Sequence, residues 1–180
     1  MNLRQVSTIK DMPVLDLETG TVLGRIVSWI IHPRDQRVAA FLLDKSFPLQ
    51  KWPVVVPADI AEYGPKMIIA RDKDVVIPSQ EVIGLPELIK HKMTITGFKA
   101  ETASGKTLGI VGDAVFDTIT SRVQKYYIRP RGLTGVIKSE LVLPASKVVS
   151  IQKRRLIFAD DVTALETSSA SRRAGVPQRV

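Results

Sequence analysis

The sequence predicts a mostly β protein: two small tandem β-barrels joined by a short helical linker, with a disordered C-terminal tail. Three observations predict this fold. First, the same pattern of turns and apolar runs occurs twice in the chain. Second, these runs are rich in β-branched and aromatic residues, and third, the last residues lack apolar periodicity. We place the first barrel at residues 1–76, the linker at 77–91, the second barrel at 92–166 and the tail at 167–180. Each barrel, at roughly 75 residues, falls within the size range of small domains.

The repeat begins at a turn glycine, Gly20 in the first copy and Gly105 in the second. Four residues later each copy has a second glycine, Gly24 or Gly109, which opens a long apolar run. The copies also share a proline corner (Val56–Ala58 and Leu143–Ala145) and a last strand (Ile68–Ala70 and Ile157–Ala159). Aligned by residue type, equivalent positions lie 85 apart at the glycines, 87 at the corner and 89 at the last strand.

The elements of the first copy follow in order from residue type. Met12–Asp16 predicts a strand, and Gly20 supplies the positive φ that its hairpin turn requires. Val22–His32 is too rich in β-branched and aromatic residues for a helix, and Gly24 predicts a β-bulge within it, as Gly109 does in the second copy. The remaining strands are Val38–Leu43, Val54–Val56 before the proline corner, and Lys66–Ala70.

The segment Ile77–Lys92 differs from both copies. Ser79 suits a helix N-cap, with Glu81 in the first turn, and Gly84 and Pro86 then interrupt the helix. We expect a partly fixed linker whose apolar residues pack against the barrels: Val82, Ile83, Leu88 and Ile89.

Composition excludes several classes of protein. The 180 residues include 44% hydrophobic and 24% charged residues, so wholesale disorder is excluded. No apolar run reaches the ~18–20 residues of a membrane helix, and Met1–Lys10 has no apolar core of a secretion signal. The absence of cysteine excludes disulfides and thiolate metal sites. We expect a soluble, cytoplasmic protein.

The charge is unevenly distributed between the halves. Residues 1–90 carry 11 basic and 11 acidic residues, whereas residues 91–180 carry 15 and seven, which accounts for the whole net charge of +8. This asymmetry favours an anionic partner for the second copy.

No pattern in the sequence predicts catalysis. His32 and His91 lie far apart and read as turn and linker residues. Ser104–Thr107 resembles the end of a phosphate-binding loop, but Ala100 stands where that loop needs glycine. The carboxylate pairs Asp72/Asp74 and Asp160/Asp161 have no nucleophile beside them and read as turn residues. Asp113 lies mid-strand, so it is expected to bond turn backbone or to pair with a cation such as Arg122. We expect no enzyme activity, no cofactor, no metal and no small-molecule substrate.

Two unlike loops are the candidate binding sites. In the second copy the candidates for binding an anionic partner are basic: Arg129, Arg131, Lys138, Lys153, Arg154 and Arg155. Either Tyr126 or Tyr127 should be exposed beside them, since neighbours on a strand face opposite ways. In the first copy the candidates for binding a protein partner are apolar: Phe47, Leu49 and Trp52.

Both copies resemble the PRC-barrel family, the small β-barrel of the photosynthetic reaction-centre H subunit and of the ribosome-maturation factor. The resemblance rests on Thr19–Gly24 and Ser104–Gly109, each leading into the apolar run, and on the strand Val111–Asp117. The first copy departs from the family pattern, with Ser28 where Asp113 stands and His32 where Asp117 stands. The resemblance implies interaction with other proteins without catalysis.

We therefore expect a non-catalytic adaptor that binds other macromolecules through its barrel loops. Two alternatives stay open: an RNA- or ribosome-associated factor, and a peripheral accessory of a membrane complex. The sequence leaves the partner, the oligomeric state and the relative orientation of the barrels open.

Overall fold

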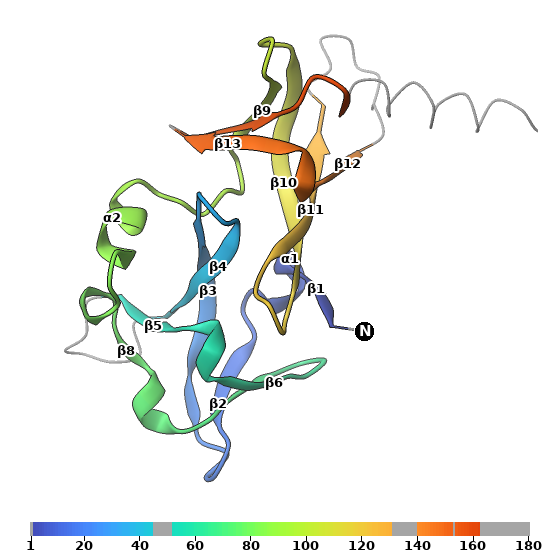
Figure 1. Cartoon of the computed structure of the whole chain (residues 1–180). Coiled ribbons are helices and arrows are strands. Elements are labelled where there is room, and N and C mark those ends of the chain that lie inside the picture. Colours follow the sequence, from blue (N-terminus) through green and yellow to red (C-terminus); the bar gives the residue numbers. More distant parts are fainter. Residues whose placement is uncertain (1, 45–51, 131–139, 153, 163–180) are drawn as a thin grey trace, which may run out of the picture.

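The computed structural model of the chain describes residues 2–44, 52–130, 140–152 and 154–162. It holds two β-sheets and a few short helices, as Figure 1 shows, which confirms the mostly β fold in two units. The predicted disordered tail, residues 167–180, lies outside the described residues.

The sheet of the first unit has the strand order β6-β7-β2-β3-β4-β5-β8. Its strands are β2 (Pro13–Asp16), β3 (Val22–His32), β4 (Arg37–Leu43), β5 (Pro53–Val55), β6 (Ile60–Tyr63), β7 (Ile68–Ala70) and β8 (Ile77–Pro78). The helices that accompany them are the 3₁₀ helices η1 (Pro57–Asp59), η2 (Lys73–Val75) and η3 (Ser79–Glu81), and the α-helix α2 (Leu85–Lys90).

The sheet of the second unit has the order β12-β11-β10-β9-β14-β13. Its elements are β9 (Lys99–Thr102), β10 (Thr107–Asp117), β11 (Val123–Arg129), β12 (Leu141–Pro144), η4 (Ala145–Lys147), β13 (Val148–Gln152) and β14 (Arg155–Phe158). Strand for strand this is the order β5-β4-β3-β2-β7-β6, and each unit joins its first and last barrel strands in parallel, β2 with β7 and β9 with β14. The two sheets therefore repeat one topology.

The segment that leads into each unit pairs with the long strand of the other unit. The chain begins with β1 (Leu3–Gln5), which runs antiparallel to β10, and the helix α1 (Val6–Ile9) then carries it to the first unit. In return, the Ile31 N–H of β3 donates to the carbonyl of Met93, 2.9 Å away, in the segment before β9. The residue patterns along the chain do not predict this exchange.

The register of the second half of the repeat differs from the sequence alignment. Phe41 lies opposite Val55. Tyr126, 85 positions after Phe41, lies opposite Leu143, which is 88 positions after Val55. The predicted offset of 87 at the corner was therefore wrong by one. The prolines are not equivalent: Pro57 begins η1, whereas Pro144 is the N-cap of η4. Both positions tolerate proline because neither needs its N–H, and aligning the two by identity shifted the register.

The last strand needs the same correction. Asp16 lies opposite Ala70, and Thr102 lies opposite Phe158, so Phe158 and not Ala159 is the equivalent of Ala70. The offset here is 88 instead of the predicted 89, and one offset holds from the corner to the end of the repeat.

The predicted bulges at Gly24 and Gly109 are confirmed by register shifts in both β2–β3 and β9–β10. Both glycines have positive φ, 152° and 150°. At Gly109 a Cβ would lie 2.2 Å from the Arg129 carbonyl oxygen, so no side chain fits there.

The linker packs more tightly on the first unit than a tether would. Leu85 of α2 is buried, and Val82, Leu88 and Ile89 pack against the core, but Ile83 is fully exposed, so the prediction for Ile83 was wrong. Ser79 also differs from its predicted role, because it lies inside η3 with Pro78 as the N-cap.

The two units meet at equivalent residues of their β3–β4 and β10–β11 turns. The Val38 N–H donates to the Ser121 carbonyl and the Val123 N–H to the Gln36 carbonyl, each at 2.9 Å. These two bonds surround a backbone bridge between Arg37 and Arg122. Each residue pairs with its counterpart 85 positions away, so an approximate twofold axis relates the units at this point.

An aromatic cluster fills the space beside this bridge. The ring of Phe116 on β10 lies 6.0 Å from Phe41 and 5.8 Å from Tyr63, both in the first unit. The buried residues of both units belong to one continuous hydrophobic cluster. The two units therefore share one hydrophobic core and are not two independent domains.

Truncating Phe116 to alanine is expected to lower the free energy of unfolding by about 3–5 kcal/mol, because it removes a fully buried ring from the shared core. Urea unfolding followed by far-UV circular dichroism measures the loss, and both units should unfold in one transition. Ile119→Ala, at a side chain that is 74% exposed, is the control and should change stability by less than about 0.5 kcal/mol. Two separate transitions in the wild-type protein would contradict a shared core.

Candidate anion-binding surface

A row of cations crosses the sheet of the second unit. The register places Arg155 of β14 opposite Lys99 of β9, Lys99 opposite Ile110 of β10, and Ile110 opposite Arg129 of β11. Residues opposite one another on neighbouring strands share a face of the sheet, and strands lie ~4.8 Å apart, so the row spans about 14 Å. We call Arg155, Lys99 and Arg129 the cationic row.

The cationic row is accessible to a partner. The side chains of Arg155 and Lys99 are 57% and 43% exposed, and Arg129 is also exposed. The Arg129 guanidinium lies over Gly112, where an added Cβ would be 2.5 Å from its Nε. The glycine thus leaves room for this arginine to lie against the sheet.

One carboxylate lies within this face. Glu101, two residues along β9 from Lys99, accepts from the Lys99 Nζ at 2.7 Å and from the Arg155 Nη1 at 3.2 Å, and its side chain is 8% exposed. The hydrogen bond from Lys99 lowers the pKa of Glu101, and the nearby charges of Lys99 and Arg155 lower it further. Among the described residues Arg129 has no carboxylate partner, so the face keeps an excess of positive charge.

The structure brings together half of the predicted basic site. Arg129 and Arg155 belong to the row, and Arg154, exposed in the β13–β14 turn, adjoins it through its carbonyl, which accepts from the Lys99 N–H at 3.1 Å. The other three predicted cations, Arg131, Lys138 and Lys153, lie outside the described residues. Sequence reasoning missed Lys99, although its alternation with the apolar Ala100 marks it as the outward residue of a strand.

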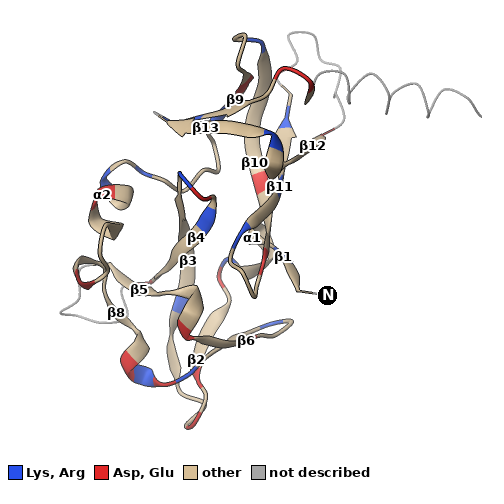
Figure 2. Cartoon of the chain, viewed as in Figure 1, with Lys and Arg blue, Asp and Glu red and all other residues tan. Residues whose placement is uncertain are grey.

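The equivalent face of the first unit is neutral. The counterparts of Arg155, Lys99, Ile110 and Arg129 are Met67, Pro13, Arg25 and Asp44. Asp44 stands where Arg129 stands, and its Oδ1 accepts from the Arg25 N–H at 2.9 Å. The charge asymmetry seen in the sequence is therefore present on this one sheet face, and Figure 2 shows the charges along both units.

The side chains of Tyr126 and Tyr127 lie on opposite faces of β11, as the alternation of a strand requires. Tyr126 is fully buried and its hydroxyl donates to the Gln36 Oε1 at 3.0 Å, whereas Tyr127 is half-buried on the same face as Arg129. Burial raises the pKa of Tyr126 far above its usual value, which keeps its hydroxyl a donor.

Of the predicted apolar loop only Trp52 is described, and Phe47 and Leu49 lie outside the described residues. Trp52 directly precedes β5 with a positive φ of 61°, and it is 41% exposed. An aromatic side chain is therefore presented at the end of this loop.

Asp113 has a structural role. Its carboxylate accepts from the Ala114 N–H at 2.8 Å, the Gln5 Nε2 at 2.8 Å and the Ser7 N–H at 3.2 Å. Of the two roles left open by the sequence, the structure shows bonding to backbone, and it shows no ion pair with Arg122. Asp113 thereby ties β1 and α1 to β10.

Two of the remaining acidic candidates, Asp72 and Asp160, serve turns, as predicted, whereas Asp161 forms an ion pair with Lys147. Asp160 accepts from the Ser104 N–H at 2.9 Å, which with the Ser104 hydroxyl lowers the pKa of Asp160, and Asp72 accepts from the Asp74 N–H at 2.8 Å. His32 Nδ1 lies 3.0 Å from Asp35 in an exposed turn. Across the described residues no group of three or more metal-binding side chains gathers, and no helix there has the length and apolarity to span a membrane.

Comparison with known families gives a match over more than half of the chain. The family described as PRC-barrel domain matches residues 1–101, more than half of the chain. The chain belongs to the PRC-barrel domain family. A search of curated proteins found no match to it.

The PRC-barrel match takes in the whole first unit and ends in β9, near the start of the second. The shared strand order relates the second unit to the PRC-barrel unit before it, and its membership of the same family stays a prediction. The cationic row, apart from Lys99, lies beyond the matched residues.

Replacing Glu101 by glutamine is expected to remove a stabilisation that depends on pH. The pKa of Glu101 in the folded protein is lowered from its usual value of 4.5. The charged carboxylate therefore stabilises the fold above pH 4.5, and this stabilisation is lost as the pH falls through the lowered pKa. The deficit of E101Q in unfolding free energy should be largest at neutral pH and should vanish in strong acid. Urea unfolding at a series of pH values measures it.

Glu87→Gln is the matched control, since Glu87 makes only longer ion pairs, of 3.7 and 3.8 Å, on the surface of α2. A deficit of E101Q that stays constant from neutral pH to strong acid would show that the carboxylate charge is not what stabilises this face.

Proposed function

We propose that this PRC-barrel protein is a non-catalytic adaptor, and that its second unit binds an anionic macromolecule through the cationic row and Arg154. The observation that carries the proposal is the register that aligns Arg155, Lys99 and Arg129 on one exposed face while the same positions of the first unit are neutral. Two copies of one scaffold with unlike faces suit a protein that holds two different partners.

An acidic protein segment is the partner that this face fits best. Ile110, half-exposed, lies between the cations in the middle of the row, so a partner contacts apolar and charged groups together. Because Glu101 already holds Lys99 and Arg155, a partner has to offer several carboxylates to compete with it. Arginine pairs with carboxylates through two parallel hydrogen bonds, which adds geometric specificity.

RNA is the second candidate, and Tyr127 is the observation that favours it. Tyr127 lies two residues from Arg129 on the same face of β11, so a base stacked on its ring would place its phosphate near the guanidinium. In this case the protein is an RNA- or ribosome-associated factor.

The first unit is proposed to bind a protein partner through the loop of Phe47, Leu49 and Trp52. The exposure of Trp52 supports this, because large aromatic side chains dominate the binding energy of protein interfaces.

Charge reversal tests the cationic row. Arg129→Glu is expected to weaken binding of a fluorescein-labelled polyglutamate peptide by at least about tenfold at low salt, since one attraction becomes a repulsion. Fluorescence anisotropy measures the affinity. Lys66→Glu is the matched control, because Lys66 occupies in the first unit the place that Arg154 occupies in the second, beside a neutral face.

Equal affinities of the wild type, R129E and K66E for polyglutamate would overturn the proposal. The same variants titrated with single-stranded RNA and with anionic lipid vesicles separate the alternatives. RNA binding with a log–log salt slope of about −2, as three phosphate contacts predict, and no binding of polyglutamate would select the RNA-associated factor. Binding to the vesicles alone would select the membrane accessory.

The two-surface arrangement has its own test. Trp52→Ala and the double variant Arg154→Glu/Arg155→Glu should each lose a different set of partners in affinity purification from the native cell, compared by quantitative mass spectrometry. If both variants recover the wild-type set, the protein does not act through these two surfaces.

A further inference from the structure

A cavity of about 250 Å³ lies where the two units meet. Its lining comes from equivalent positions of both units: Val27 and Ser28 on β3 correspond to Gly112 and Asp113 on β10, and Lys10 corresponds to Thr96. The cavity therefore lies near the approximate twofold axis. It lies between the long strands β3 and β10 and the two segments that the units exchange. None of its lining residues belongs to the cationic row or to the loop of Phe47, Leu49 and Trp52.

Two β-bulges shape this cavity. The register of β3 with β4 shifts between Ile26 and Ser28, and that of β10 with β11 shifts at the equivalent place, between Val111 and Asp113. A bulge bends its strand and leaves one residue unpaired, and bulges are frequent next to functional sites. Here the residues at the two bulges, Val27 and Gly112, both line the cavity.

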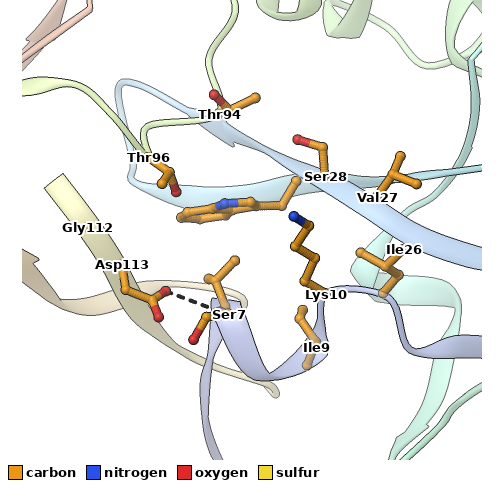
Figure 3. Close-up of a pocket in the computed structure, with 12 residues that line it drawn as sticks. Ser7, Ile9, Lys10, Ile26, Val27, Ser28, Thr94, Thr96, Gly112 and Asp113 are labelled. Atoms are coloured by element: carbon orange, nitrogen blue, oxygen red, sulfur yellow. Dashed lines mark hydrogen bonds between the residues drawn. The ribbon is translucent and has the colours of Figure 1, made fainter.

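Hydroxyl groups and one ammonium group line part of the cavity, and Lys10 and Thr96 among them are exposed residues. Figure 3 shows Lys10, Ser28, Thr94 and Thr96 around the space, from both units. Among the described residues none of these four side chains makes a hydrogen bond or ion pair. Trp29, which also lines the cavity, is only 5% exposed, and its indole N–H likewise has no acceptor there.

The only carboxylate of the lining is already committed. Asp113 accepts three hydrogen bonds from Gln5, Ser7 and Ala114, so its charge is satisfied within the protein. The ammonium of Lys10 has no such counterpart. The cavity thus offers one cation and several hydroxyl groups that can donate to a ligand, a combination that suits an anionic ligand.

Apolar side chains form the rest of the wall, namely Val6, Ile9, Ile26 and Val27 beside the Trp29 indole. At ~30 Å³ for each water, the cavity holds roughly eight waters. Its volume is below the ~300 Å³ at which sites for drug-sized ligands begin. A ligand that fits has one anionic group and a short apolar body.

We propose that this cavity binds a small organic monocarboxylate. The carboxylate of the ligand contacts Lys10 and the hydroxyls of Ser28, Thr94 and Thr96. Its apolar body packs against Trp29, Ile9 and Ile26. Because the lining comes from both units and both leading segments, the bound ligand joins them. Binding to the folded state alone raises the stability of the whole chain.

The test uses Trp29 as the reporter. In a Trp52→Phe background Trp29 is the one remaining tryptophan, since the chain has two. Hexanoate, the probe, is expected to shift its emission in a saturable way and to raise the melting temperature. Hexanamide keeps the apolar body without the charge, and inorganic phosphate keeps charge without the body, so both should bind at least about tenfold more weakly.

Two further variants place the ligand. Lys10→Gln should weaken hexanoate binding by about tenfold or more, whereas Lys106→Gln, at an exposed lysine of the β9–β10 turn, should leave it unchanged. Ser28→Leu fills the cavity with an apolar group and should abolish binding while the chain still folds. Equal affinity for hexanoate and hexanamide, unchanged binding by K10Q, or no response of Trp29 to hexanoate would each overturn the proposal.

Discussion

The arrangement of the whole molecule depends on a pair of main-chain hydrogen bonds between equivalent turns. Gln36 and Ser121 both adopt positive φ, 55° and 60°, and this conformation directs each turn toward its counterpart. Gln36 adds two side-chain bonds, donating to the Ala145 carbonyl at 3.2 Å and accepting from the Tyr126 hydroxyl. With Phe41, Tyr63 and Phe116 packed beside these turns, the two units have one fixed orientation, and both the exposed sheet face and the cavity follow from it.

Local chemistry made much of this fold predictable from sequence. Glycine at 24 and 109 predicted bulges because only glycine accepts that backbone, and the β-branched runs predicted the long strands. What the sequence did not predict depends on distant partners. The exchange of β1 onto β10, and the place of Lys99 beside Arg155, come from pairings between residues far apart in the chain. The offset of 88 was missed for another reason: residue identity favoured aligning two prolines that the backbone uses differently.

The two copies have kept their cores and changed their outer faces. Position for position, Phe41 corresponds to the buried Tyr126, while the half-buried Asp44 corresponds to the exposed Arg129 in the second copy. A core residue is restricted by close packing, so it changes only to side chains of similar volume. An outward residue of a sheet has no such restriction, and a few substitutions on one row suffice to give one scaffold two electrostatic characters.

Gly112 connects the sheet face with the cavity. It lines the cavity from β10, and the Arg129 guanidinium lies against it, so a side chain at this position would displace the arginine. The bulge that opens the cavity is thus also the feature that sets the place of one cation of the row. An anion held inside the cavity would add negative charge near Arg129 and weaken its attraction for an acidic partner. Were the cavity and the cationic row both to bind anions as proposed, occupancy of one would oppose occupancy of the other.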